Sequence, residues 1–329
     1  MNAAVRERFG SPDEVVEVQE LEKPVPADDE VLVRVRVAAL NLGDWYAVTG
    51  RPWVARPSTG LRRPKSETLG ADFAGTVEAV GASVTQFRPG DEVFGARSGA
   101  LAEYVCVPED RGVVTKPAEL TFEEAAAVPV AALTALQGVR DKGQLEPGQK
   151  VLINGASGGV GTFAVQVAKA LGADVTAVCS PQNVDTARSL GADHVVDYTR
   201  EDFTRSDRRY DLLLDIAGSR SWSECKRVLD PQATVMIVGG QRGSRLLGPL
   251  SHVVKMRLAA MRSSQKVGFF IAQMNKEDLA VLRDLVEAGK VRSVIDRRYH
   301  LGEVADAFRY IGEGHARGKI VVDVGGTAP

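Results

Sequence analysis

The spacing of hydrophobic and polar residues changes about a third of the way along the chain. Up to about residue 120 the apolar residues fall in short runs, and the clearest, 30–40 (EVLVRVRVAAL), alternates apolar and polar side chains. A period of two is typical of a strand with one buried face. Further short runs at 73–81, 90–96 and 101–108 are separated by turns such as FRPGD at 87–91. Many short strands joined by Gly- and Pro-containing turns predict a small β-barrel or sandwich.

A helical region follows this first part. Within 117–139, Thr121 precedes Glu124 by three residues, which is the spacing of a capping box that opens a helix. Pro129 interrupts the segment, and a second helical stretch continues to about Val139. We therefore expect two consecutive helices here.

From residue 150 onward, predicted strands and helices alternate. The pieces LLLDIA and VMIVG are nearly continuous apolar runs, as in parallel strands covered by helices on both faces. Repeated strand–helix units predict a doubly wound α/β sheet. The predicted strands are 150–154, 174–179, 194–198, 210–218, 233–240, 293–299 and 319–324, and the predicted helices are 159–172, 182–190, 276–288 and 302–313.

Length and composition narrow the class of protein. A chain of 329 residues predicts two domains, and 44% hydrophobic with 26% charged residues is typical of a globular protein in water. A formal net charge of −2 provides no general attraction for nucleic acid. The N-terminus MNAAVRERFGSPDE lacks the apolar core of a signal peptide, and no apolar run is long enough to cross a membrane. We expect a cytoplasmic protein without stable membrane insertion.

The three cysteines, Cys106, Cys179 and Cys225, lie far apart and form no CxxC pair. This spacing argues against a disulfide framework. We expect reduced and mostly buried thiols.

A glycine-rich turn lies between a predicted strand and helix, in NGASGGVGTFAVQVAKALGA at 154–173. The turn reads Ala156-x-Gly158-x-x-Gly161, with Ala at the first glycine position of the dinucleotide-binding pattern. Free N–H groups at a helix N-terminus and the positive end of its dipole favour phosphate. The turn therefore predicts a bound pyrophosphate; the alternative is a glycine-rich connection without a ligand.

The end of the next strand indicates which dinucleotide binds. A ribose-binding carboxylate is expected there, but the strand ends with Cys179 and Ser180. A carboxylate close to the 2′-phosphate of NADPH would repel it, so its absence permits NADPH, and Ser180 can donate a hydrogen bond. Tyr198 and Arg188 are further candidates, although Arg188 could be a solvated helix residue. We expect NADP(H) as the cofactor.

At this point the chain resembles the medium-chain dehydrogenase/reductase superfamily, in particular its quinone oxidoreductase-like branch. The resemblance implies a GroES-like β-barrel catalytic domain plus a Rossmann doubly wound parallel-sheet domain, with the active site in the cleft between them. It assigns residues 1–120 and 297–329 to the catalytic domain and 121–296 to the dinucleotide-binding domain. Besides the glycine turn, the matching segments are NLGDWYAVTG (41–50), LGADFAGTVEAVG (69–81), FRPGDEVFG (87–95), LGADHVVDYT (190–199) and GHARGKIVVDV (314–324).

The resemblance also implies the residues that contact the cofactor. Some relatives carry a lysine for the 2′-phosphate where this chain has Asn183, which weakens the expectation of NADP(H) without reversing it. Thr134 could face the nicotinamide or be a buried helix residue. The strand VGFFIA (267–272) resembles the late strand that abuts the nicotinamide in relatives, although Phe269 and Phe270 could be core residues. The candidate cofactor residues are Ser157, Gly158, Gly159, Val160, Gly161, Ser180, Arg188, Tyr198, Thr134, Gly239, Phe269 and Phe270.

The residue types expected for zinc are missing from the positions that carry them in zinc-dependent relatives. Asn41 stands where such relatives have a first Cys, and GAD at 70–72 replaces Gly-His-Glu. The chain has no cysteine cluster, and its four histidines, at 194, 252, 300 and 315, lie outside the N-terminal domain. Because zinc requires thiolate, imidazole or carboxylate ligands, we expect neither a catalytic nor a structural zinc. An adventitious metal site is the alternative.

Without a metal, a reaction that needs little Lewis-acid assistance is favoured. Hydride transfer from NADPH to a quinone, or to the C=C bond of an enone, delocalises charge onto an oxygen that hydrogen bonds can stabilise. Candidate catalytic residues are Tyr46 as donor to that oxygen, Asn41 as hydrogen-bonding group and Asp44 as an orienting or ribose-binding group. The alternative is that Trp45 and Tyr46 only pack and Asp44 only caps a helix.

Several alternatives remain open. An enoyl-thioester reductase is the closest alternative, and a redox sensor that binds NADPH without turnover, or an RNA-associated protein, belongs to a different class. A homodimer is expected from relatives. The basic and apolar segment 242–266, within a stretch free of Asp and Glu from Pro231 to Lys276, could be a lid over the substrate, a dimer contact or a helix that touches anionic lipid.

Overall fold

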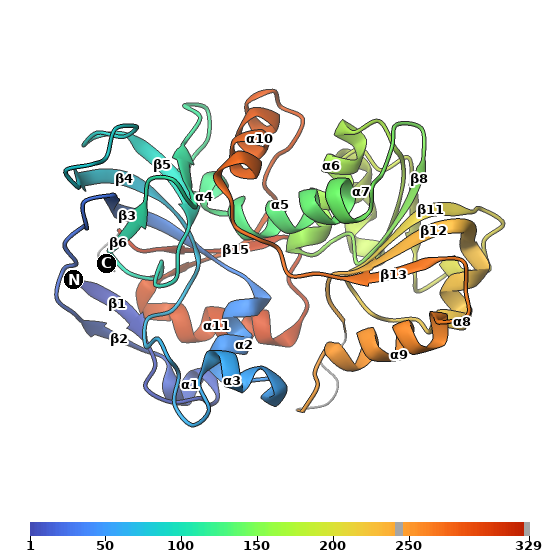
Figure 1. The fold of residues 1–329 in the computed structure, drawn as a ribbon, viewed down its shortest axis with the longest axis horizontal. Helices are drawn as coiled ribbons and strands as arrows, with labels where there is room; N and C mark the ends of the chain where they lie inside the picture. The colour runs from blue at the N-terminus through green and yellow to red at the C-terminus, as the bar shows by residue number, and fades with distance from the viewer. Residues whose placement is uncertain (241–245, 326–329) are drawn as a thin grey trace. The chain divides into compact units, whose positions relative to one another are not determined.

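The computed structural model describes residues 1–240 and 246–325, apart from the side chain of residue 58, and its contacts group the chain into two units (Figure 1). Unit 1 comprises Met1–Leu133, Met274–Gly289 and Ser293–Pro329, and unit 2 comprises Thr134–Gln273 and Lys290–Arg292. The division into domains at 1–120 with 297–329 and at 121–296 stays a prediction.

Unit 1 is built on a mixed sheet in the order β14-β15-β3-β4-β5-β7, with β6 also paired to β3. The alternation in 30–40 has its predicted effect, because Val33 and Val35 are buried while Arg34 and Arg36 are exposed. The strands are β3 (Glu30–Leu40), β4 (Asp72–Val80), β5 (Glu92–Ala96), β6 (Tyr104–Pro108), β7 (Val113–Thr115), β14 (Ile295–His300) and β15 (Lys319–Asp323).

The last strand of the chain returns to the first long one. β15 pairs antiparallel with β3, Ile320 opposite Leu40, and β3 pairs with β4, Ala39 opposite Asp72. This register brings together the end of β3 and the starts of β4 and β15. Three polar side chains meet there, as described below.

The remaining elements of unit 1 are short or pack on this sheet. Thr121 caps α4, as predicted from the capping box with Glu124. A hairpin of β1 (Asn2–Val5) and β2 (Glu17–Glu20) was not predicted from the sequence. The helices are α1 (Pro12–Val15), α2 (Leu42–Thr49), α3 (Arg56–Thr59), α4 (Phe122–Ala126), α10 (Lys276–Glu287) and α11 (Val304–Glu313), with 3-10 turns at Trp53–Ala55 and Leu301–Glu303.

Unit 2 contains a parallel sheet in the order β10-β9-β8-β11-β12-β13, and every pair in it is parallel. Numbered along the chain this is 3-2-1-4-5-6, the order of a doubly wound dinucleotide-binding fold, so that prediction is confirmed. The strand order reverses between β8 and β11. The strands are β8 (Lys150–Asn154), β9 (Asp174–Cys179), β10 (His194–Asp197), β11 (Tyr210–Asp215), β12 (Leu229–Ile237) and β13 (Lys266–Phe269).

The helices of unit 2 differ in detail from the prediction. The predicted helix 182–190 is α7 (Val184–Ser189), preceded by a 3-10 turn, Pro181–Asn183, that starts with proline. α5 (Pro129–Leu136), which begins in unit 1 and ends in unit 2, continues as a π-helical stretch, Gln137–Lys142. The other elements are α6 (Gly159–Ala170), α8 (Trp222–Cys225), α9 (Leu250–Ala260) and 3-10 turns at Phe203–Arg205 and Lys226–Val228.

Candidate functional site

The glycine turn of unit 2 joins β8 to the N-terminus of α6, with Gly158 as the N-cap residue. Gly155 has a φ of +96°, a conformation that favours glycine. A Cβ on Gly161 would overlap the Gly155 carbonyl oxygen and lie 2.7 Å from Ala156 Cα, so only glycine allows this close packing of helix on turn. A Cβ on Gly158 would meet only the Gly155 oxygen, at 3.9 Å, so this part of the turn is open to an approaching group.

A buried hydrogen-bond network fixes the loops beside the turn. The Asn154 amide donates to Asp215 Oδ1 at 2.8 Å and to Ser219 Oγ at 3.2 Å. Asp215 also accepts from the Gly218 backbone N–H at 2.9 Å and contacts His252 Nε2 at 2.9 Å. β8 and β11 are neighbours at the point where the strand order reverses, so this network holds the edge at which such folds bind ligands.

A cavity of about 300 Å³ lies at the same edge of unit 2. Of the residues predicted to bind the cofactor, Ser157 and Tyr198 line it. Sequence reasoning missed Arg220, whose guanidinium lies 5.7 Å from the centre of the Phe203 ring and 3.5 Å from Asp202. The lining residues are Asn154, Gly155, Ser157, Val178, Cys179, Tyr198, Phe203, Ala217, Ser219 and Arg220.

Two residues predicted to contact the 2′-phosphate lie outside the lining of this cavity. Ser180 Oγ accepts a hydrogen bond from Asn183 Nδ2 at 2.7 Å, which ties the end of β9 to the turn before α7. Arg188 is 65% exposed and lies 3.7 Å from Asp185 of its own helix. Its position is that of the solvated helix residue considered as the alternative.

The other predicted cofactor residues of unit 2 contact its own core. A Cβ on Gly239 would lie 2.5 Å from the Ile216 carbonyl oxygen, so the loop after β12 packs closely on the loop after β11. The Phe270 ring packs at Gly138, and Phe269 is a half-buried neighbour of the core. Thr134 and Val160 are also half-buried, in α5 and α6 respectively. Their roles toward a cofactor stay predictions.

Unit 1 holds a buried polar cluster that contains Asn41. Lys319 Nζ donates to Asn41 Oδ1 at 2.6 Å and lies 3.0 Å from Asp72 Oδ2. Asn41 Nδ2 donates to Asp72 Oδ2 at 2.9 Å, and the Val130 backbone N–H donates to Asp72 Oδ1 at 3.0 Å. The side chains of Lys319 and Asp72 are 2% and 0% exposed. Both ends of the Asn41 amide are therefore engaged, which fixes its orientation.

Asp72 and Lys319 were not among the residues predicted from the sequence. A charged residue at the start of an apolar strand, in GADFAG and GKIVVDV, was the available signal. Contact between the two depends on strands that are far apart in the sequence, and only the sheet register shows it.

Asp44 lies in the first turn of α2, where its Oδ2 accepts the backbone N–H of Asn41 at 2.8 Å. The capping role considered for it is thus present. Burial raises the pKa of Asp44 to about 7, and the negative charge of Asp72 acts in the same direction while Lys319 acts against it. Asp44 is therefore a group that can hold a proton near neutral pH.

Tyr46, on the next turn of the same helix, is half-buried and lies edge-to-face with Trp45, the ring centres 5.3 Å apart. A Cβ on Gly312 would lie 3.1 Å from Trp45 Cδ1, so Trp45 packs on α11. Packing is thus observed for Trp45, while a role of Tyr46 as a hydrogen-bond donor stays a prediction.

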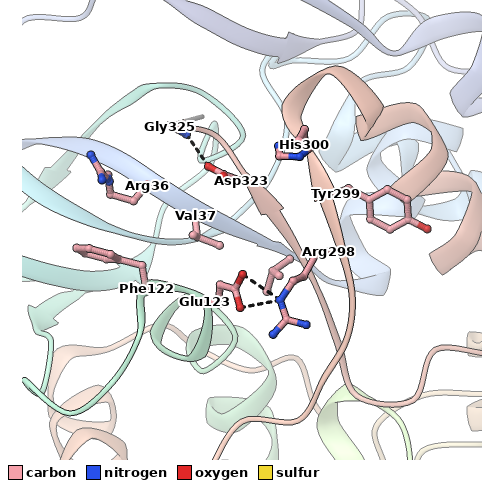
Figure 2. Close-up of a pocket in the computed structure, with 10 residues that line it drawn as sticks. Arg36, Val37, Phe122, Glu123, Arg298, Tyr299, His300, Asp323 and Gly325 are labelled. Atoms are coloured by element: carbon pink, nitrogen blue, oxygen red, sulfur yellow. Dashed lines mark hydrogen bonds and ion pairs between the residues drawn. The ribbon is translucent and has the colours of Figure 1, made fainter. Parts of the chain in front are cut away.

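Unit 1 contains a cavity of about 450 Å³ that is lined by none of the predicted site residues (Figure 2). Arg298 Nε donates to both Glu123 carboxylate oxygens, at 2.8 and 3.0 Å, on one wall, and Arg36 lies 6.0 Å from the centre of the Phe122 ring on another. The lining carries two arginines, Arg36 and Arg298, and two acids, Glu123 and Asp323, so this cavity presents no strong net charge.

The described residues contain no group of three or more His, Cys, Asp or Glu side chains placed to hold a metal ion. The Asp72 carboxylate is committed to Lys319, Asn41 and Val130, so it does not fit a zinc ligand. The three cysteines are free, with Cys179 and Cys225 buried, and burial raises the pKa of these thiols to about 11 and 12. Among the helices within 1–240 and 246–325, none is long and apolar enough to cross a membrane.

Comparisons with known proteins agree with this architecture. Residues 27–118 match the alcohol dehydrogenase GroES-like domain, and residues 190–322 match a family described as zinc-binding dehydrogenase. The mouse protein named NAD(P)H oxidoreductase RTN4IP1, mitochondrial, is 35% identical, with 98% of this chain and 89% of that protein covered. The tomato 2-methylene-furan-3-one reductase is 32% identical, with 95% and 76% covered.

Among solved structures, the quinone oxidoreductase from Coxiella burnetii has the same fold. The TM-score is 0.86 with 29% sequence identity, and the match covers 98% of this chain and 99% of that one. The similarity therefore extends over both units.

Proposed function

Because the chain belongs to the medium-chain dehydrogenase/reductase superfamily and is an oxidoreductase of that family, we propose that it is a zinc-independent reductase that transfers hydride from NADPH to quinones or α,β-unsaturated carbonyl compounds. The observation that carries this proposal is the turn before α6, which is closed by Gly161 and open at Gly158. The names of the mouse, tomato and Coxiella proteins support a nicotinamide cofactor and a conjugated carbonyl or quinone substrate.

The residues of unit 2 fit a dinucleotide. The N-terminus of α6 offers backbone N–H groups and the positive end of the helix dipole to a pyrophosphate, and Gly158 carries no side chain in the way. The cavity lined by Tyr198, Phe203 and Arg220 suits the adenosine half, because an aromatic face and a guanidinium both stack on a base. Ser180 and Asn183 provide uncharged polar groups at the end of β9, which favours a 2′-phosphate over a carboxylate-bound ribose.

When bound, NADPH supplies the hydride. The residues of unit 1 stabilise the charge that then develops on the substrate oxygen. Lys319 and Asp72 hold the Asn41 amide in one orientation, which leaves its second Nδ2 N–H to donate to that oxygen. The Tyr46 hydroxyl is the second donor, and Asp44 holds a proton near neutral pH close to the same helix start.

The test is a screen of hydride transfer at 340 nm with NADPH and NADH against quinones, enones, aldehydes and a crotonyl thioester. We expect turnover of quinones or enones with NADPH, unaffected by metal chelators. Preferred reduction of the thioester would instead identify an enoyl-thioester reductase. Tight NADPH binding without oxidation of the cofactor by any acceptor would identify a sensor.

Matched variants test the cofactor residues of unit 2 and the catalytic residues of unit 1 separately. Gly158→Val places a side chain in the open part of the turn, and we expect the Kd for NADPH to rise about tenfold or more. Gly302→Val, at a glycine with no atom within 4 Å of a Cβ, is its control. Tyr46→Phe is expected to lower kcat about tenfold or more with little change in cofactor affinity. Its control is Tyr310→Phe, which removes a hydroxyl that donates to Asp296 and should leave kcat unchanged.

We propose a cytoplasmic homodimer. The name of the mouse relative places that protein in mitochondria. Fractionation of the producing cells and sedimentation of the purified protein test the two parts of this proposal separately.

A further inference from the structure

Helix α9 presents apolar side chains to solvent as well as to the core of unit 2. Its buried residues are Val253, Met256 and Ala260, which pack with the cluster around β12. On the outside, Val254 is 50% and Leu258 63% exposed. A short helix on a sheet of this kind normally has a polar outer face, so this exposure needs an explanation.

The exposed apolar residues form a stripe rather than a scatter. Val254, Leu258 and Met261 follow one another at intervals of four and three residues, which places them on one side of the helix and its C-terminal turn. Met261 is 76% exposed, and Leu247, in the turn before the helix, is 43% exposed. Exposed cations flank the stripe on both sides, with Arg257 on one and Lys255 and Arg262 on the other. We call these seven residues the α9 surface.

Among the residues that the structure describes, no acidic side chain forms an ion pair with Lys255, Arg257 or Arg262 of the α9 surface. No Asp or Glu occurs between Pro231 and Lys276. α9 contacts α8 and β13, and Figure 1 shows α8 beside one end of α9. On α8, Glu224 lies 3.7 Å from Arg220, and on β13 the exposed Lys266 adds a further positive charge.

A partner for this surface must accept apolar side chains and positive charge together. A second copy of the chain docked through the same surface would bring Lys255, Arg257 and Arg262 of both copies together, and such like charges repel. A bilayer with anionic headgroups satisfies both requirements, because the apolar stripe enters the boundary of the acyl chains while the flanking cations contact phosphate. We propose that the α9 surface docks the protein reversibly on membranes rich in anionic phospholipid.

Vesicle flotation with the full-length protein tests this docking. We expect the protein to float with vesicles of phosphatidylcholine containing a third phosphatidylglycerol, and to stay behind with pure phosphatidylcholine vesicles or at high salt. Leu258→Asp/Met261→Asp and Lys255→Glu/Arg262→Glu should each reduce the bound fraction roughly tenfold or more. All four positions are exposed, so thermal unfolding should not change.

Two control variants carry replacements of the same kinds elsewhere. Leu61 is 70% exposed, and Arg62 and Arg63 follow it in unit 1. Leu61→Asp and Arg62→Glu/Arg63→Glu should leave flotation unchanged. The proposal is overturned if the unaltered protein does not float, or if both α9 variants float as well as the unaltered protein. It is also overturned if Leu258→Asp/Met261→Asp converts a dimer to a monomer in sedimentation, because the surface is then an interface between copies.

Discussion

Asp72 in unit 1 and Asp215 in unit 2 are both almost completely buried, and their carboxylates are held in closely similar ways. Asp72 in unit 1 accepts from the Asn41 amide and from the Val130 backbone N–H. Asp215 in unit 2 accepts from an asparagine amide and from a backbone N–H in the same manner. Their exposed fractions are 0% and 1%.

The third partner differs. Lys319, 2% exposed, carries its positive charge into the interior beside Asp72, whereas His252, 15% exposed, contacts Asp215 and can donate a hydrogen bond as a neutral imidazole. The cluster of unit 1 is therefore an ion pair that must stay complete, because a buried charge without a partner is costly. The cluster of unit 2 is a hydrogen-bond network from which one donor can be lost at a smaller cost.

The largest expected effect comes from removing the buried cation. Lys319→Met leaves Asp72 without its counter-charge, and we expect the free energy of unfolding of unit 1 to fall by about 3–5 kcal/mol. Trp45 and Trp53 lie in unit 1 and the third tryptophan, Trp222, in unit 2. Fluorescence-monitored denaturation in a Trp222→Phe background therefore reports unit 1.

The control is an exposed pair from the same unit. Arg298 and Glu123 are 60% and 35% exposed, and Arg298→Met should cost no more than about 1 kcal/mol. The double variant Lys319→Met/Asp72→Asn should recover part of the loss, because it removes the unpaired charge. Equal costs for Lys319→Met and Arg298→Met would contradict the distinction between buried and exposed pairs.

The second prediction concerns the acid beside this ion pair. The pKa of Asp44 is raised to about 7 from an ordinary 3.8, so between these values the folded protein holds a proton that the unfolded chain has released. Its contribution to stability is full at low pH and is lost as the pH rises toward 7, by about 4 kcal/mol at most. Asp44→Asn keeps an oxygen to accept the Asn41 N–H and should abolish this loss.

The measurement is the difference in unfolding free energy between the two proteins at pH 4 to 8. That difference isolates Asp44 from the other carboxylates, whose contributions change in the opposite direction. A difference that stays constant over this range would show that Asp44 has an ordinary pKa.

The same comparison shows how far the sequence could predict the structure. The parallel sheet of unit 2 and its glycine turn were predicted correctly because apolar runs and glycine spacing are local signals. The two aspartate clusters were missed. Asn41 meets Lys319 only through the pairing of β3 with β15, and His252 meets Asp215 only through the packing of α9. Neither contact has a local pattern.

Local sequence signals also failed where one residue type can serve two roles, such as an arginine that can bind a cofactor or form an ion pair at the surface. Arg188 is a cation near the end of a predicted cofactor strand, but it projects from α7 and pairs with Asp185. Arg220, which does line the cavity beside Tyr198, follows a strand that pairs on the other side of β8. The place of Arg220 at this cavity depends on the order of strands in the sheet. No local pattern in the sequence indicates that order.

The smallest of the expected effects belongs to the unit 2 cluster. His252→Leu removes one of three hydrogen-bond donors from Asp215, and we expect a loss of about 1–3 kcal/mol. His252→Gln, whose amide can donate to the same oxygen, should recover most of it. Fluorescence of Trp222 in a Trp45→Phe/Trp53→Phe background follows unit 2, since Trp222 lies in unit 2 and lines one of its cavities together with His252. A loss as large as that of Lys319→Met would mean that Asp215 depends on a charged partner after all, and the two clusters would then follow one rule rather than two.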